Sequence, residues 1–464
     1  MSTFNVKNPA TGKVLAEIQE STKEEVEAII EDVHQGFSEW KSRDAHDRAA
    51  IIKKWHDLIE ENKNELAEII TKESGKPLKE ALGEVNYANS YIAWYAEEAK
   101  RIYGKTIPAS TPNKNIIIKK QPVGVVAGIT PWNFPAAMLT RKTAPALAAG
   151  CTFVAKPAVE TPLTTIKLVE LAHEAGVPKN VLQYVNGSGS KIGPIFTENK
   201  LVKKITFTGS TPVGKNLIRE SAKTVKHVSM ELGGHAPIIV CEDADIEAAA
   251  TQTLISKFRN AGQTCICANR VFVHESVVTA FADKLKEKVS QLKIGNGLEE
   301  ETDIGPLINK KGFDKVKAQC ENAAKLGAEI LVGGHGKVDE DKETYFFEPT
   351  VLLNATQEMD IMNDETFGPL LPIQSFANID EAISLANSLP FGLAAYYFTN
   401  DYRTGLYLSD HLDFGVIGWN DGAPSAAYAP FGGLKESGIG KEGGAEGMEP
   451  YLDTKYLSIG GLKV

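Results

Sequence analysis

From Val123 onward the chain alternates between apolar runs of strand length and segments of helix length, and this alternation constrains the fold most. The runs are Val123–Ile129, Cys151–Ala155, Val181–Val185, Lys204–Phe207 and Val225–Met230, and Pro162–Ala175 is a typical helical segment between them. Strands that alternate with helices form βαβ units, whose strands lie parallel in one sheet. The alternation resumes with a helix over Asp243–Arg259 and continues to about Asn420. The sequence therefore predicts an α/β protein with two such units in succession.

The first hundred residues are predicted to be mainly helical. Thr22 and Glu25 have the spacing of a capping box, and apolar residues then recur at helical spacing to about Gly104. A short strand expected at Ile116–Lys120 has no neighbour in sequence that could pair with it. The strand-like run Lys455–Ile459 near the C-terminus is the candidate partner.

Composition narrows the class of protein. At about 150 residues per domain, 464 residues predict roughly three compact units. The net charge of −10 and the lack of a Lys/Arg-rich stripe indicate no nucleic-acid partner. No apolar run approaches 18 residues, and the N-terminus lacks the pattern of a secretion signal, so we expect neither membrane insertion nor export. Five cysteines are too few for a disulfide framework, which fits a cytoplasmic protein.

Cys265 is the cysteine most suited to chemistry. It follows the small polar turn Asn260–Thr264, between a predicted helix and a predicted strand, whereas packing or simple surface placement explains Cys151, Cys241 and Cys320. Cys267 forms a Cys-Ile-Cys pair with it, but no second Cys or His pair at metal-ligand spacing exists, so no metal site is predicted. A reversible, strained Cys265–Cys267 disulfide is the alternative use of the pair.

Three further positions are ambiguous when taken singly. Glu231 ends a predicted strand before Gly233 and Gly234, where it is either a salt-bridged edge carboxylate or a catalytic one. Gly209 and Ser210 open a predicted helix. This segment is either a pyrophosphate site formed by backbone N–H groups or an ordinary turn between a strand and a helix. The regular G-x-G-x-x-G fingerprint is absent. Asn133 is either a turn residue or a donor to an oxyanion.

Taken together, five motifs resemble the NAD(P)-dependent aldehyde dehydrogenase superfamily in order and spacing, nearly from end to end. They are Thr-Pro-Trp-Asn-Phe-Pro at 130–135, Phe-Thr-Gly-Ser-Thr at 207–211, Met-Glu-Leu-Gly-Gly at 230–234, Gly-Gln-Thr-Cys at 262–265 and Glu-Thr-Phe-Gly-Pro at 365–369. The resemblance implies Cys265 as the nucleophile, Glu231 as the general base, and Asn133 with the Cys265 backbone N–H as the oxyanion hole. When a thiolate adds to an aldehyde, the oxyanion that forms needs hydrogen-bond donors. Hydrolysis of the later thioester needs a base that takes a proton from water.

The resemblance also implies an aldehyde dehydrogenase-like fold with two Rossmann-like, parallel-sheet domains and a small β arm for oligomerisation. The expected ranges are 1–108 and 123–233 for the cofactor-binding domain, 234–435 for the catalytic domain, and 109–122 with 436–464 for the arm. A homodimer or a homotetramer is expected, because the strand near Ile116 could also extend a neighbour's sheet.

The cofactor residues follow from the same resemblance. They are Trp132, Lys156, Val159, Gly209, Ser210, Leu232, Glu365 and Phe367. Many NAD-preferring members carry a Glu where this chain has Val159, and a carboxylate there would repel a 2′-phosphate. The sequence therefore favours NADP slightly over NAD, with Glu160 next door leaving the preference open.

Within the superfamily the chain most resembles succinate-semialdehyde dehydrogenases. Arg141, Arg259 and Ser425 match the positions that bind the substrate carboxylate in that subfamily, as guanidinium donors and a hydroxyl would. The expected reaction is oxidation of succinate semialdehyde to succinate. A broader enzyme acting on substrates such as glutarate semialdehyde, a structural ion pair for either arginine, and a non-catalytic protein on the same fold are the alternatives.

Overall fold

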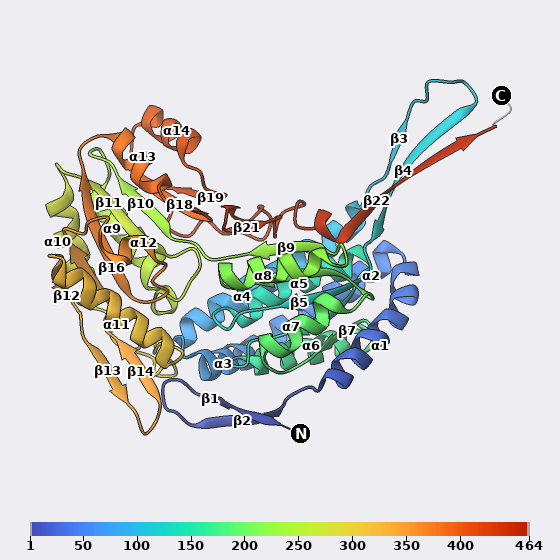
Figure 1. The fold of residues 1–464 in the computed structure, drawn as a ribbon, viewed down its shortest axis with the longest axis horizontal. Coiled ribbons are helices and arrows are strands. Elements are labelled where there is room, and N and C mark those ends of the chain that lie inside the picture. Colours follow the sequence, from blue (N-terminus) through green and yellow to red (C-terminus); the bar gives the residue numbers. More distant parts are fainter. Residues whose placement is uncertain (1, 462–464) are drawn as a thin grey trace.

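Two α/β bodies and a projecting β arm make up the computed structural model, which describes residues 2–461 (Figure 1). The first body is built on a six-stranded sheet of order β21-β9-β8-β5-β6-β7. Its strands are β5 (Val125–Ile129), β6 (Thr152–Lys156), β7 (Leu182–Tyr184), β8 (Val202–Thr208), β9 (His227–Glu231) and β21 (Gly438–Ile439). The five strands from β5 to β9 run parallel, as predicted, and β21 is antiparallel to β9.

Helices cover both faces of this sheet. They are α1 (Lys23–Ser42), α2 (Ala45–Glu61), α3 (Lys63–Ser74), α4 (Leu78–Glu98), α5 (Pro135–Ala149), α6 (Pro162–Ala175), α7 (Gly189–Glu198) and α8 (Thr211–Ala222). Side chains alternate along β5, so Val126 packs with helices α2 to α6 while Val125 and Ala127 pack with α1, α7 and α8. Thr22 caps α1 in the capping box that the sequence predicts.

The second body contains a seven-stranded sheet of order β12-β15-β16-β11-β10-β18-β19. Its strands are β10 (Ala236–Val240), β11 (Ala268–His274), β12 (Glu329–Val332), β15 (Thr350–Leu353), β16 (Leu370–Phe376), β18 (Ala394–Phe398) and β19 (Val416–Trp419). The helices are α9 (Ile246–Phe258), α10 (Val278–Val289), α11 (Lys310–Lys325), α12 (Asp360–Asn363), α13 (Ile379–Asn387) and α14 (Tyr402–His411). Only β12 is antiparallel to its neighbour, so the expected second parallel unit is present.

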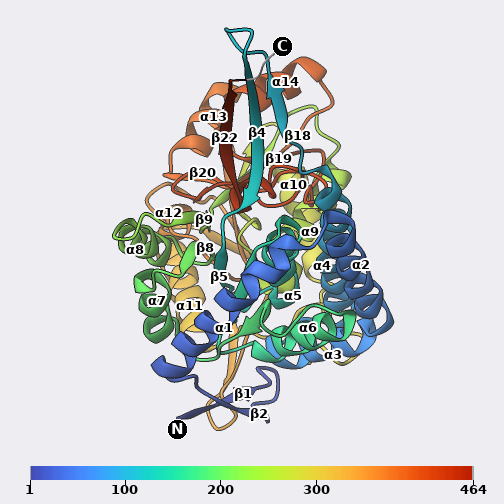
Figure 2. The same ribbon diagram turned by 90° about the vertical axis from the view of Figure 1, so that its right-hand side faces the viewer.

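The arm is a three-stranded antiparallel sheet of order β22-β4-β3 that extends away from both bodies (Figures 1 and 2). It consists of β3 (Lys105–Ile107), β4 (Lys114–Pro122) and β22 (Leu452–Gly460). Ile116 pairs with Ser458 in this sheet, so the prediction that the C-terminal run is the partner of the isolated strand is confirmed.

Two strands pair outside the domain range in which the sequence prediction places them. β3 belongs to the arm although it falls within 1–108, and β21 joins the first sheet although it falls within 436–464. Residue 1 and residues 462–464 of these ranges lie outside the described part of the chain.

Local geometry departs from the predictions at two places. The expected strand Val225–Met230 begins only at His227, because Val225 has φ 52° in an exposed turn. An antiparallel hairpin of β1 (Thr3–Lys7) and β2 (Val14–Gln19) precedes the helical region.

Two shorter strand pairs complete the fold. They are β13 (Gly336–Asp339) with β14 (Thr344–Phe347) and β17 (Phe391–Gly392) with β20 (Leu434–Lys435). Within residues 2–461, no helix is long and apolar enough to cross a membrane.

Candidate active site

Cys265 lies on the loop between α9 and β11, where two cavities meet. The loop turns sharply, because Asn260, Ala261 and Gly262 all have left-handed backbone angles, with φ between 52° and 73°. Left-handed angles in the first two residues are strained, and such strain is typical of functional loops. The Cys265 side chain is partly exposed and lines both cavities.

The first cavity, here called the arginine cavity, has a volume of about 270 Å³. It brings together all three residues that the sequence predicts for a substrate carboxylate, Arg141, Arg259 and Ser425. Its wall also includes one face of α4, formed by Glu80, Gly83, Glu84 and Tyr87. The remaining lining residues are Phe134, Met138, Thr264, Ile266, Ala423 and Phe431.

The two arginines of this cavity have different surroundings. Arg141 is buried, forms an ion pair with Glu442, and lies 4.2 Å from the ring centre of Phe431. Arg259 forms no ion pair within residues 2–461, and its buried Nε has no hydrogen-bond partner there. The buried Oγ of Ser425 is likewise without a partner in the described chain. Arg141 thus already balances a protein carboxylate, although its buried Nη2 is also without a hydrogen-bond partner in the described chain. Arg259 has no such carboxylate there and, like Ser425, retains a donor for a ligand.

The second cavity, here called the glycine-loop cavity, has a volume of about 430 Å³. Most of the predicted cofactor residues line it: Trp132, Gly209, Ser210, Leu232, Glu365 and Phe367. Ser210 is the N-cap of α8 but its side chain does not cap the helix, so the first N–H groups of α8 remain available to an anion. The Thr366 Oγ, which also lines the cavity, has no partner in residues 2–461. These features fit a dinucleotide.

Lys156 and Val159 do not line the glycine-loop cavity. Val159 lines a neighbouring cavity, and Glu160 contributes to both. Lys156 is the last residue of β6, and burial lowers its pKa to about 8 while Glu160 opposes that effect. That Lys156 and Val159 bind the cofactor, as the family resemblance implies, remains a prediction.

The environment of Cys265 disfavours the thiolate. Protein atoms around the thiol replace water and raise its pKa to about 12; Arg141 opposes this, and Glu365 adds to it. A base is therefore needed to remove the proton near neutral pH. Cys267 lies buried beside it, donates to the Gly262 carbonyl at 3.1 Å, and all five cysteines are free.

Glu231 is the last residue of β9, as predicted, and it is buried. Burial raises the pKa of its carboxyl well above the usual value, and the nearby charge of Glu442 raises it further. The carboxylate lies against Gly432, where an added Cβ would come within 2.8 Å of Oε1. Glu231 lines neither cavity, so it would have to turn toward Cys265 to act on a molecule bound there.

Asn133 is held against the loop that carries Cys265. Its Nδ2 donates one hydrogen bond to the Gln263 carbonyl at 2.9 Å, and the residue lines the glycine-loop cavity. An amide nitrogen has two N–H donors, so the second is available to an oxygen bound near Cys265.

Sequence reasoning missed one part of the site, the buried cluster around Glu442. Glu442 forms ion pairs with Arg141 and with Lys142, which also donates to Thr208 at 2.5 Å. About 300 residues separate Glu442 from its partners, so no local spacing could reveal the cluster. The α4 face of the arginine cavity did carry a signal, since Glu80, Glu84 and Tyr87 recur at helical spacing.

No group of three or more potential metal ligands occurs in residues 2–461, so no metal site is identified there.

Comparisons with known proteins agree over the whole chain. The family model described as Aldehyde dehydrogenase family matches residues 1–457. A glutarate-semialdehyde dehydrogenase from Pseudomonas putida is 49% identical over 98% of this chain and 94% of its own length. An NADP(+) succinate-semialdehyde dehydrogenase from Escherichia coli is 46% identical over 98% of this chain and 94% of its own. The crystal structure of succinate-semialdehyde dehydrogenase from Burkholderia pseudomallei superposes with a TM-score of 0.97, at 47% identity, covering 99% of this chain and 95% of that one.

Proposed function

The chain belongs to the aldehyde dehydrogenase family, and from this premise we propose that it oxidises succinate semialdehyde to succinate with reduction of NADP or NAD. It is thus an aldehyde dehydrogenase, and the alternative of a non-catalytic protein on this fold is not supported. One observation carries the substrate proposal: Cys265 lies where the arginine cavity, with unpartnered donors on Arg259 and Ser425, meets the glycine-loop cavity.

In the proposed reaction Glu231 accepts the Cys265 proton and releases it to solvent, and the sulfur adds to the carbonyl carbon of the aldehyde. The carbonyl oxygen becomes an oxyanion, which accepts hydrogen bonds from Asn133 Nδ2 and from the Cys265 backbone N–H. The cofactor, when bound, supplies the hydride acceptor that makes the adduct a thioester. Glu231 then takes a proton from water, the resulting hydroxide attacks the thioester carbon, and the acid leaves as the Cys265 thiol is restored.

The substrate carboxylate is assigned to Arg259 and Ser425. A guanidinium binds a carboxylate through two parallel N–H donors, and a hydroxyl adds a third. Arg141 contributes positive charge to the same cavity but is shared with Glu442. Glutarate semialdehyde is the second candidate substrate, because the relative from Pseudomonas putida is named for it.

The cofactor preference is proposed to lean toward NADP. The proposal is supported by the apolar Val159 at the position where many NAD-preferring family members carry a Glu, and by the relative from Escherichia coli, which is named for NADP(+). The ratio of kcat/KM values for the two cofactors tests this lean directly. A preference for NAD of tenfold or more would reverse it.

A homodimer or homotetramer held by the arm is proposed as well. The arm extends from the bodies (Figure 2). Its residues Ile107, Tyr456 and Leu457 are exposed. An exposed strand edge with apolar side chains is a surface that a second copy can cover. Light scattering on the purified protein gives the assembly mass, and a monomer would contradict the proposal.

Steady-state kinetics test the substrate. We expect kcat/KM for succinate semialdehyde to exceed that for butanal, which lacks the carboxylate, by about 100-fold. Equal values would reject the substrate assignment while leaving the enzyme class intact, and a higher value for glutarate semialdehyde would favour the second candidate. In the same assay Cys265→Ser should abolish reduction of NADP and NAD. Unchanged reduction would reject the proposed nucleophile.

A further inference from the structure

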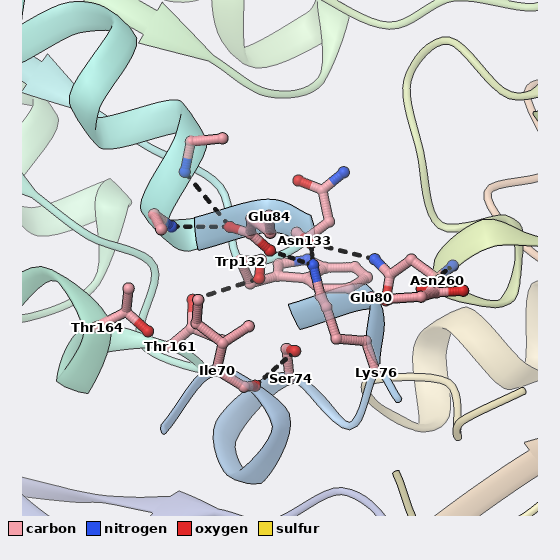
Figure 3. Close-up of polar contacts among 12 residues, drawn as sticks. Ile70, Ser74, Lys76, Glu80, Glu84, Trp132, Asn133, Thr161, Thr164 and Asn260 are labelled. Carbon is pink, nitrogen blue, oxygen red and sulfur yellow. Dashed lines mark hydrogen bonds and ion pairs between the residues drawn. The ribbon is translucent and has the colours of Figure 1, made fainter. Parts of the chain in front are cut away.

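A buried ion pair between Lys76 and Glu84 lies beside the oxyanion donor Asn133. Both side chains are fully buried, and Lys76 precedes α4 while Glu84 lies within it. The Lys76 ammonium also donates to the Asn133 carbonyl at 2.6 Å (Figure 3). It lies 3.9 Å from the ring centre of Phe134. The ammonium thus joins a helix carboxylate to the backbone of Asn133.

Glu84 holds the next part of the same segment. Its second oxygen accepts from the backbone N–H groups of Ala136 at 2.9 Å and Ala137 at 3.3 Å, in the first turn of α5. The N-cap residue of α5, Phe134, provides no side-chain cap. A carboxylate at a helix N-terminus satisfies unpaired donors and complements the helix dipole. Lys76 and Glu84 therefore fix the backbone on both sides of Phe134.

The same network reaches the nucleophile loop. The Asn133 carbonyl also accepts from Asn260 Nδ2 at 3.1 Å, and the Asn260 backbone N–H donates to Glu80 at 2.8 Å (Figure 3). Asn260 has the left-handed φ of 52° described above. Helix α4 thus supplies Glu80 to the loop before Cys265 and Glu84 to the segment that carries Asn133.

We propose that Lys76 and Glu84 are positioning residues that set where the Asn133 amide meets the developing oxyanion, an inference that rests on the proposed function. Neither residue needs to touch the reacting atoms. They act through the backbone. Lys76 holds the Asn133 carbonyl and Glu84 holds the first turn of α5, so the segment that carries Asn133 has little freedom to shift. Misplacement of a catalytic group by about 1 Å can cost about 100-fold in rate.

The double variant Lys76→Met/Glu84→Gln tests the link between the Lys76–Glu84 pair and the backbone of Asn133. It leaves no unpaired buried charge, Met fills much of the lysine volume, and the Gln oxygen can still accept from α5. The variant removes the Lys76 donor to the Asn133 carbonyl together with the Lys76–Glu84 ion pair and the ammonium beside Phe134, while the Asn260 donor to that carbonyl remains. The matched control is Glu73→Gln, because Glu73 is a buried carboxylate that accepts from the first turn of α6 at Leu163 and Thr164.

Two rates separate positioning from general structural damage. Turnover requires the oxyanion, whereas alkylation of Cys265 by iodoacetamide forms none. We expect the double variant to lose about 10- to 100-fold in kcat while its alkylation rate stays within twofold of the parent. Glu73→Gln should keep kcat within twofold.

A kcat of the double variant within twofold of the parent would overturn the inference, and so would a parallel fall in kcat and alkylation rate, which would indicate a collapsed loop. If the double variant does not fold, Lys76→Arg replaces it, because Arg keeps the ion pair with Glu84 but has a different length and shape. The inference then requires a loss of at least threefold in kcat with an unchanged alkylation rate. Failure of the proposed function is distinguishable, because it appears as equal kcat/KM for succinate semialdehyde and butanal in the parent enzyme, or as full activity in Cys265→Ser.

Discussion

Replacement of Arg259 by leucine tests how the arginine cavity selects its substrate. The structure leaves the Arg259 Nε without a partner in residues 2–461, so a bound carboxylate is expected to form two charge-assisted hydrogen bonds with the guanidinium. Each such bond contributes about 1.5–3 kcal/mol. Their joint loss is therefore at least about 3 kcal/mol, and every 1.4 kcal/mol is tenfold. We expect Arg259→Leu to lower kcat/KM for succinate semialdehyde by about 100-fold or more.

Butanal provides the internal control, because it has no carboxylate to lose. Its kcat/KM should stay within about threefold in Arg259→Leu, and Arg259→Lys should lie between the parent and the leucine variant for succinate semialdehyde. Arg141→Lys, which keeps a cation beside Glu442, should affect both substrates to a similar extent. An equal loss for both aldehydes in Arg259→Leu would refute the reasoning, since it would indicate damage to the loop rather than a lost anchor.

In cofactor-free protein, the rate of Cys265 alkylation by iodoacetamide should rise about tenfold per pH unit from pH 7 to 9, because the thiolate fraction grows toward a pKa of about 12. A plateau below pH 9 would contradict that environment. Gly83→Ala should raise the free energy of unfolding by about 0.5–1 kcal/mol, since an added Cβ meets no described atom within 4 Å; a lower urea midpoint would count against it. Gly83→Leu should reduce kcat/KM for glutarate semialdehyde more than for succinate semialdehyde, because Gly83 lines the arginine cavity, whereas Asn86→Leu, also exposed on α4, should change neither. Mild peroxide should stop turnover by joining Cys265 to Cys267, faster at higher pH, and peptide mass spectrometry without a loss of two hydrogens would exclude that bridge.

Much of the framework could be predicted locally. Strand and helix periodicity places several site residues correctly. It places Glu231 at the end of β9, Gly209 and Ser210 before α8, and Cys265 between α9 and β11. The pairing of Lys455–Ile459 with the Ile116 segment followed from the need of an isolated strand for a partner. The predicted roles of these residues came from the family resemblance.

Periodicity and motif order established the alternating α/β plan, the cysteine in a polar turn and the kinship to a family, because each depends on residues close together in the chain. Contacts between distant segments could be decided only by folding. Glu442 reaches Arg141 and Lys142 across about 300 residues, and Lys76 reaches the Asn133 carbonyl across 57. Which arginine stays free for a ligand depends on such contacts, since a buried charge must find its counter-charge wherever the packed chain brings one.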